Sequence, residues 1–306
     1  MRHLLVTGLR HIQWAWASHR EPETITAMYD QAIDLYDQGD YAAARDLNEQ
    51  VVEARTRVLG PEHPDTLWAM TNLANALGSL GDYAGARDLE EQLVEDRTRV
   101  LGPEHPDTLA TMGNLANTLR EQGDYAAARD LDEQVLEACT RVQGSEHPDT
   151  LSAKNNLAVT LRHQGDYACA RVLYELLLEA GSVVFLTEHP DTLGTMGNLA
   201  NALRRQGDYA AARDLDEQVL EARTRVLGPE HPMTIGAMSD LAGALSGQGD
   251  DAGARDLYEQ VLEERVRTRG PEDPRTLGTM GDLSRVLWGQ GDLAGARDLQ
   301  AKVLEA

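Results

Sequence analysis

Apolar residues recur at helical spacing in two runs within every 42 residues of the chain. In one such stretch the first run has apolar side chains three or four residues apart and stops at Gly81. The second run begins directly afterwards and stops at Gly102. Polar residues lie between the apolar ones, so each run predicts a helix with one face toward a core. The first run comprises Leu67, Met70, Leu73, Ala74 and Leu77, and the second comprises Ala86, Leu89, Leu93 and Val100.

The same pattern occurs seven times without an insertion or a deletion, and this repetition decides the architecture. A Gly-Asp dipeptide marks the end of the first run in each copy. A Pro followed two residues later by Thr marks its beginning. The glycines are Gly39, Gly81, Gly123, Gly165, Gly207, Gly249 and Gly291, and the prolines are Pro22, Pro64, Pro106, Pro148, Pro190, Pro232 and Pro274.

The residues at the ends of each run are typical of helix ends. Pro64 suits the first turn of a helix, because that turn needs no amide donor from it. Gly81 is a typical helix stop, and Asp82 can accept a hydrogen bond from the free amides that begin the next helix. Each copy is therefore predicted to be a pair of helices, and the predicted fold class is all-α.

The helix pairs, the alanine-rich contacts and the apolar spacing resemble the tetratricopeptide repeat. The 42-residue period and the phrase Leu59-Gly60-Pro61-Glu62-His63-Pro64-Asp65-Thr66 resemble in particular the repeats of kinesin light chain and its bacterial, especially actinobacterial, relatives. The resemblance covers residues 21–306. It implies a right-handed α-solenoid of seven antiparallel helix pairs in a single array, with the last repeat truncated.

Residues 1–20 are in register with the second helix of an absent earlier copy. They are therefore predicted to form an N-terminal capping helix, or half-repeat. At the other end the chain stops inside the seventh copy. Terminal repeats usually need a polar outer face, so we expect either self-association through the repeat ends or a longer parent chain.

One position departs from the family pattern. The family usually has an aromatic residue in the second helix where this chain has mostly polar ones. This substitution predicts a thinner core between repeats. The residues at this position are Asn48, Glu90, Asp132, Tyr174, Asp216, Tyr258 and Gln300.

Composition adds limits on partners and compartment. Aromatic residues make up only 5% of the 306 residues, which favours packed helices over sheets. The 51 acidic and 28 basic residues give a net charge of -23, which argues against nucleic acid and anionic membranes as partners. Two cysteines, Cys139 and Cys169, cannot form a disulfide framework. We therefore expect a soluble cytoplasmic protein.

The candidate binding surface is the face of the first helices opposite the core. In one repeat this face carries Trp68, Thr71, Asn72, Asn75, Gly78 and Ser79. Down the array the same positions form rows of amide and basic side chains. The asparagine rows comprise Asn72, Asn114, Asn156 and Asn198, and Asn75, Asn117 and Asn201; the basic row comprises Arg120, Arg162 and Arg204, with His163 and Arg205 beside it.

These rows predict a concave groove that binds an extended peptide. Asparagine can pair with both the amide and the carbonyl of an extended backbone, and arginine can form a forked pair with a carboxylate. The expected partner is therefore an acidic protein or peptide. Two alternatives stay open: the asparagines bond neighbouring helices instead of a ligand, and the arginines are simply solvated.

Two exceptions to the repeat fall in the fourth copy. Lys154 replaces a repeated Met, and because a buried unpaired ammonium is costly, its side chain is expected to extend toward the groove. Val183, Val184 and Phe185 replace a more polar segment of the other copies. They form either a turn that packs inward or an exposed apolar contact for a partner.

Catalytic and metal-binding signatures are missing from the sequence. Five histidines recur once per repeat just before the first-helix proline, so neighbours are too far apart to share a metal ion and are predicted to be turn or cap residues. No phosphate-binding loop, zinc-protease helix or nucleophile elbow occurs in the sequence. We expect no enzyme activity, no metal and no cofactor. The histidines are His63, His105, His147, His189 and His231.

The sequence therefore predicts a non-enzymatic scaffold for protein–protein interaction. A second hypothesis is the sensor or autoinhibitory region of a bacterial signalling protein that hydrolyses nucleotides, because similar arrays occur in such proteins. A third is a structural module that associates through its repeat ends.

Overall fold

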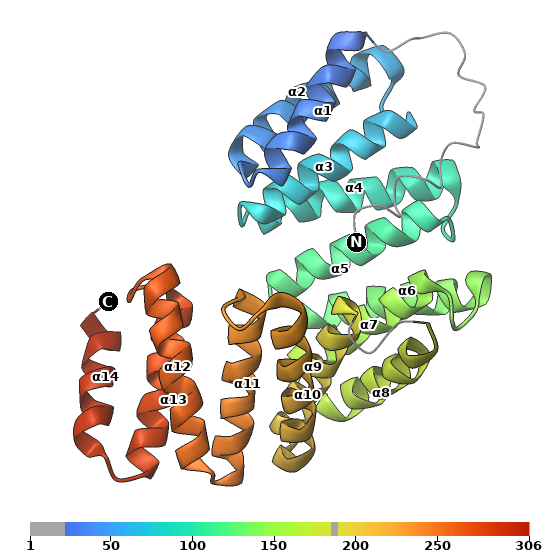
Figure 1. Ribbon diagram of the computed structural model, residues 1–306. Coiled ribbons are helices and arrows are strands. Elements are labelled where there is room, and N and C mark those ends of the chain that lie inside the picture. The colour runs from blue at the N-terminus through green and yellow to red at the C-terminus, as the bar shows by residue number, and fades with distance from the viewer. Residues whose placement is uncertain (1–21, 185–188, 306) are drawn as a thin grey trace. The chain divides into compact units, whose positions relative to one another are not determined.

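The computed structural model describes residues 22–184 and 189–305, and these two ranges form fourteen helices without a β-strand. By its internal contacts the chain divides into two compact units, unit 1 (Met1–Ala138) and unit 2 (Cys139–Ala306). Figure 1 shows the helices of both units. The odd-numbered helices are the first helices of the repeats, and the even-numbered ones are the second helices.

Unit 1 contains α1 to α5 and most of α6. Each helix from α1 to α5 packs against the next, and the first helices α1 and α3 also touch (Figure 1). Small clusters of buried apolar residues fill the space between them, such as Leu67, Met70 and Leu93. The helices are α1 (Glu23–Asp37), α2 (Tyr41–Leu59), α3 (Pro64–Ser79), α4 (Tyr83–Leu101), α5 (Pro106–Glu121) and α6 (Tyr125–Gln143).

Unit 2 contains α7 to α14, and each of these helices packs against the next. The first helices α7, α9, α11 and α13 also contact one another in that order. Both units therefore have the neighbour-to-neighbour packing of a solenoid. The helices are α7 (Pro148–Gln164), α8 (Tyr167–Val184), α9 (Pro190–Gln206), α10 (Tyr209–Leu227), α11 (Pro232–Gln248), α12 (Asp251–Arg269), α13 (Pro274–Gly289) and α14 (Leu293–Glu305).

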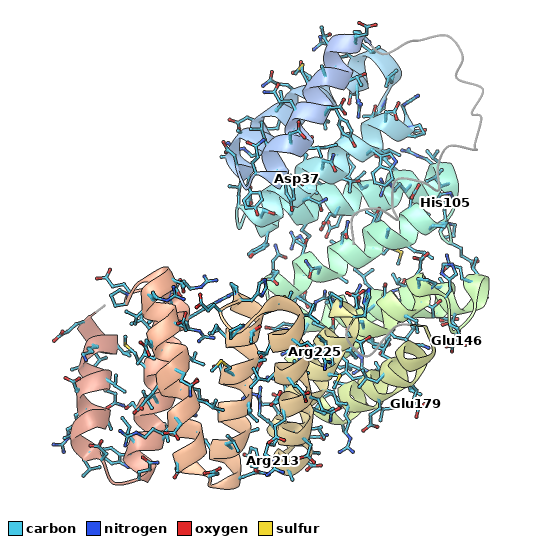
Figure 2. All side chains as sticks on the ribbon, viewed as in Figure 1. Asp37, His105, Glu146, Glu179, Arg213 and Arg225 are labelled. Carbon is cyan, nitrogen blue, oxygen red and sulfur yellow. The ribbon has the colours of Figure 1, made fainter. Side chains whose placement is uncertain are left out.

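A histidine begins most of the first helices. In α5 the Nδ1 atom of His105 accepts a hydrogen bond of 3.2 Å from the amide of Asp107, and Pro106 occupies the first turn. Figure 2 shows His105 in the turn that precedes α5. The predicted cap role of the five histidines is confirmed, since the same bond is made by His63, His147, His189 and His231.

The helix stops and the second-helix caps also agree with the sequence. Gly81 and Gly102 have φ values of +82° and +97°, in the region that favours glycine, and each follows the end of a helix. The Oδ1 atom of Asp82 accepts a hydrogen bond of 3.0 Å from the amide of Gly85 at the beginning of α4. The all-α fold of consecutive helix pairs is therefore confirmed.

A buried arginine of α4 links successive first helices. The guanidinium of Arg97, which is 3% exposed, donates to the Thr71 hydroxyl of α3 at 3.0 Å and to the Asp107 carbonyl of α5 at 3.2 Å. It also donates to the Thr111 hydroxyl. The expectation that Thr71 lies on the open face is wrong, because this contact buries it.

Four of the polar residues that replace the family's aromatic residue are buried. Asn48, Glu90, Asp132 and Asp216 are each less than 5% exposed, whereas Gln300 is exposed. These buried polar groups form part of the core of their repeats and need partners there.

Two further expectations concern the N-terminal capping helix and membrane-spanning helices. The predicted capping helix at residues 1–20 lies outside the described residues. Within the two described ranges, no helix combines the length and the apolar character that crossing a membrane requires.

Candidate functional site

Three of the predicted groove asparagines line one cavity in unit 1. Asn75 of α3 and Asn114 and Asn117 of α5 surround a space of about 430 Å³, whose other walls come from α1 and α4. Asn75 and Asn117 are exposed and Asn114 is half-buried, so the cavity opens to solvent beside two amides. The fold thus brings members of both asparagine rows to one place.

Hydrogen bonds fix the walls of this cavity. The hydroxyl groups of Tyr36 and Ser79 lie 3.0 Å apart and join α1 to α3. The Oδ1 atom of Asn117 accepts a hydrogen bond of 2.9 Å from Nη2 of Arg120. This bond orients the Asn117 amide, because only its oxygen can accept from a guanidinium.

Glu90 of α4 is the charged group inside the cavity. The residue is only 4% exposed, and within the described part of the chain its Oε2 atom has no hydrogen-bond partner. Burial raises the pKa of Glu90 to about 7, although a hydrogen bond with the Thr118 side chain favours the charged form. A buried carboxyl group with an unsatisfied oxygen is unusual in a folded protein and calls for an explanation.

The equivalent acids of two other repeats are paired with predicted groove arginines. In unit 1, Nη1 of Arg120 lies 3.1 Å from Oδ2 of Asp132. In unit 2, Nη1 of Arg204 lies 3.0 Å from Oδ2 of Asp216, and its Nη2 lies 2.9 Å from Oδ1 of Asp240. The side chains of both arginines are largely buried, so these ion pairs neutralise much of their charge inside the repeats.

Asp216 resembles Glu90 in its titration. Burial raises the pKa of Asp216 to about 7, and Arg204 opposes this effect only in part. Burial likewise lowers the pKa of the neighbouring Arg223. The two buried carboxyl groups, one in each unit, therefore change protonation near neutral pH.

The other predicted basic residues lie in unit 2. Nη2 of Arg162 lies 3.1 Å from Nε2 of His163, and both residues belong to the last turn of α7. Arg205 is exposed in the last turn of α9. The ammonium of Lys154 donates to the carbonyl of Ser145 at 3.0 Å, in the turn before α7.

The remaining asparagines are half-buried. Asn72 forms a side-chain hydrogen bond with Tyr29, a contact between neighbouring first helices, which fits the structural alternative for this residue. The others, Asn156, Asn198 and Asn201, lie on α7 and α9 of unit 2. Their predicted ligand role stays a prediction.

The predicted apolar contact of the fourth copy falls where little is described. Phe185 lies outside the described residues. The backbones of Val183 and Val184 end α8, and their side chains are not described. Elsewhere in the described ranges, no group of three or more His, Cys, Asp or Glu side chains is placed to hold a metal ion.

The sequence does not single out Glu90 as a site residue, although a signal for it exists. In two repeats an arginine of the first helix stands twelve residues before the acid of the second helix, and the two side chains form an ion pair. At the same spacing before Glu90 the chain has Gly78 instead. Glu90 is therefore an acid at this position without an arginine twelve residues before it.

A model described as the tetratricopeptide repeat matches residues 23–98, 91–141, 114–182 and 191–263, and a second model with the same description matches residues 276–306. A search of curated proteins found no match.

Several solved structures are similar to the chain. A variant form of the nearly identical TPR-like repeats of a Podosopora anserina kinesin light chain protein is 30% identical, with a TM-score of 0.61, over 68% of this chain and 98% of that one. NprR in complex with its cognate peptide NprX is 15% identical, with a TM-score of 0.63, over 94% and 79%. The STAND protein PH0952 from Pyrococcus horikoshii, which has a tetratricopeptide repeat sensor, is 13% identical, with a TM-score of 0.68, over 92% and 42%.

Proposed function

Because the chain belongs to the tetratricopeptide-repeat family, we propose that it is a non-enzymatic protein-interaction scaffold whose first helices bind an extended peptide. The observation that carries this proposal is the open cavity of unit 1, which Asn75, Asn114 and Asn117 line from two successive first helices. Amide groups spaced along such a surface can pair with the N–H and C=O groups of an extended backbone. The structure of NprR with its peptide supports the proposal to the extent that a related fold holds a peptide.

Each unit has its own expected preference for the charge of a bound peptide. Arg120 and Arg204 face buried carboxylates, so they contribute less to an acidic preference than the sequence implies. Arg162 and His163 end α7 and Arg205 ends α9, and these two first helices are in contact. We therefore assign a preference for acidic peptides to unit 2.

Selection from a displayed library of random linear peptides tests peptide binding. Peptides enriched on the full chain are expected to bind the Asn75→Ala/Asn117→Ala double variant at least about tenfold more weakly, which is about 1.4 kcal/mol. Gln92→Ala is the matched control, because Gln92 is an exposed amide on the second helix α4. The proposal is lost if no peptide is enriched, or if the double variant and the control bind selected peptides equally well.

Charge preference needs a separate pair of variants. Selected peptides rich in Asp and Glu are expected to lose affinity when Arg162 and Arg205 are both replaced by Gln. Arg225→Gln is the control, because Arg225 is exposed near the end of the second helix α10 (Figure 2). Equal losses in both variants would mean that the charge effect is general rather than local to the first helices.

A sensor region in a signalling protein is the second candidate function. The similarity of fold to PH0952, whose repeats are described as a sensor, favours this candidate over self-association through the repeat ends. The coding sequence that precedes Met1 in the genome tests it. We expect an in-frame nucleotide-binding domain there, and an in-frame stop codon directly before Met1 would contradict the idea.

A further inference from the structure

The seven repeats provide an internal comparison at one pair of positions. Twelve residues separate the arginine of the first helix from the acid of the second helix in the ion pairs Arg120–Asp132 and Arg204–Asp216. In the repeat formed by α3 and α4, the acid remains as Glu90 while Gly78 stands at the arginine position. This repeat therefore has a buried acid without the guanidinium that accompanies it elsewhere.

The space that a guanidinium fills in the other two repeats is open here. Gly78 and Glu90 both line the cavity of about 430 Å³. A Cβ atom placed on Gly78 would have no neighbouring atom within 4 Å. Glu90 is 4% exposed and its Oε2 atom has no hydrogen-bond partner among the described residues. The cavity thus ends at a buried acceptor that nothing in the described part of the chain satisfies.

The other groups around the cavity also suit a cation. Among the described residues that line it, none is Lys or Arg, and Glu121 adds a second carboxylate. Oxygen acceptors come from Asn75, Asn114 and the hydroxyl of Ser79. A guanidinium carries five N–H donors and no acceptor, so it can use several of these oxygens at once.

We propose that this cavity takes the guanidinium group of an arginine side chain from a bound peptide, with the Glu90 carboxylate as its counter-ion. The inference rests on the proposed peptide-binding function. It identifies arginine as the peptide residue that this cavity of unit 1 binds. The bound arginine occupies the place that Arg120 and Arg204 hold in their own repeats. A lysine ammonium could reach the same carboxylate, but its compact charge would leave more of the surrounding acceptors unused.

The test uses the isolated full chain and the probe Nα-acetyl-arginine N-methylamide. Binding is followed by NMR through the backbone amides of Gly78 and Thr118, which line the cavity. We expect saturable shifts of these amides with the arginine probe. The citrulline analogue is nearly isosteric but uncharged, and it is expected to bind at least about tenfold more weakly, since it cannot form the ion pair.

Two pairs of variants localise the effect. Glu90→Gln is expected to weaken binding of the arginine probe at least about tenfold. Glu91→Gln, at an exposed neighbouring position on α4, is expected to leave the affinity for the probe unchanged. Gly78→Arg is expected to abolish binding, because the introduced guanidinium fills the cavity. Gly281→Arg is its control, since Gly281 is exposed on α13 with equally open surroundings. If Gly78→Arg fails to fold, the Glu90 and Glu91 variants decide the question alone.

The outcomes separate this inference from peptide binding in general. Equal binding of the arginine and citrulline probes, or of the arginine probe to Glu90→Gln and the unaltered chain, overturns the inference. Library peptides that depend on Asn75 and Asn117 but show no preference for arginine would leave the proposed function standing while the inference fails. Probe binding that depends on Glu90, with no peptide enriched from the library, would support the cation site and overturn the peptide-binding function.

Discussion

The buried Asp216 forms an ion pair with Arg204, one of the arginines predicted to line the groove. The carboxylate is 2% exposed, and Arg204 contacts it at 3.0 Å. Above the Asp216 pKa of about 7, where the carboxyl group is ionised, replacement of Arg204 by Met leaves the buried acid without its ion pair, and we expect a loss of about 3 kcal/mol in the free energy of unfolding. Urea unfolding measures this loss. Arg205→Met, at an exposed position of the same helix, should change stability by less than about 0.5 kcal/mol.

A double variant tells the two roles of Arg204 apart. Arg204→Met combined with Asp216→Leu removes both charges, and we expect it to regain most of the lost stability because an apolar pair of similar volume often replaces a buried ion pair. If Arg204→Met alone is as stable as the unaltered chain, the ion pair is not structural. Such a result would return Arg204 to the candidate ligand-binding residues.

Glu90 makes stability depend on pH in a predictable direction. Its pKa rises from about 4.5 to about 7 on folding, so the folded chain binds a proton more tightly than the unfolded chain between these values. The free energy of unfolding therefore falls as pH rises from 4.5 to 7. We expect a contribution of roughly 3 kcal/mol, since each tenfold change in proton affinity corresponds to about 1.4 kcal/mol.

Urea unfolding of Glu90→Gln at several pH values checks this prediction. The variant should lose that part of the pH dependence, whereas the exposed Glu91→Gln should keep it. Glu121, Tyr36 and Tyr83 are the other titratable groups that line the cavity, and all three remain in both variants. Identical pH profiles for the two variants would contradict the assignment to Glu90.

Side chains cap the N-termini of the first helices, and the capping residue differs between α11 and α13. It is His231 in α11 and Asp273 in α13. His231 begins α11 by accepting a bond from the amide of Met233, while Asp273 does the same for α13 through the amides of Arg275 and Thr276. His231→Ala should lower the free energy of unfolding by about 1 kcal/mol, because a helix amide loses its acceptor. His231→Asp should lose much less, and thermal unfolding of both variants compares them. Equal losses would show that the histidine ring acts by packing and not as a cap.

The caps and stops were predictable because they depend on near neighbours. Gly81, Asp82 and His63 each act within a few residues of their own position, so their chemical type and spacing are sufficient. The direction of a long side chain, in contrast, depends on which side chains of the next helix lie within its reach. The sequence places Arg204 in the basic row, but whether its guanidinium faces solvent or Asp216 depends on the packing of α9 against α10.

The cavity was harder to predict because it arises from a missing side chain. Gly78 contributes no atoms beyond its backbone, and its effect appears only when the neighbouring repeats show what fills the same place. Asn75, Asn114 and Asn117 were predicted as one surface, since residues a repeat apart on successive first helices come to equivalent positions. The acid beneath them required the structure.

At the scale of the whole chain, stability should be distributed by repeat. In a repeat array each helix pair is stabilised mainly by its neighbours, so a local loss need not spread. Arg97 is suited to test this, because its guanidinium bonds the Thr71 hydroxyl of α3 and the Asp107 carbonyl of α5.

The net charge of -23 is likewise an average over repeats in which individual acids are exposed, paired or, as with Glu90, buried without a cation among the described residues.

Arg97→Met should destabilise the N-terminal repeats selectively. The loss of several hydrogen bonds from one charged donor should cost about 3 kcal/mol, and Arg97→Lys should recover little of it because an ammonium lacks the planar fork. Hydrogen exchange should then quicken in α1 to α5, while α9 to α14 keep their protection. Arg57→Met, at an exposed position of α2 whose ion-pair partner Glu53 is also exposed, should leave both regions unchanged. If protection falls equally along the whole chain, the array unfolds as one cooperative body, and Arg97 stabilises the whole chain and not its own neighbours alone.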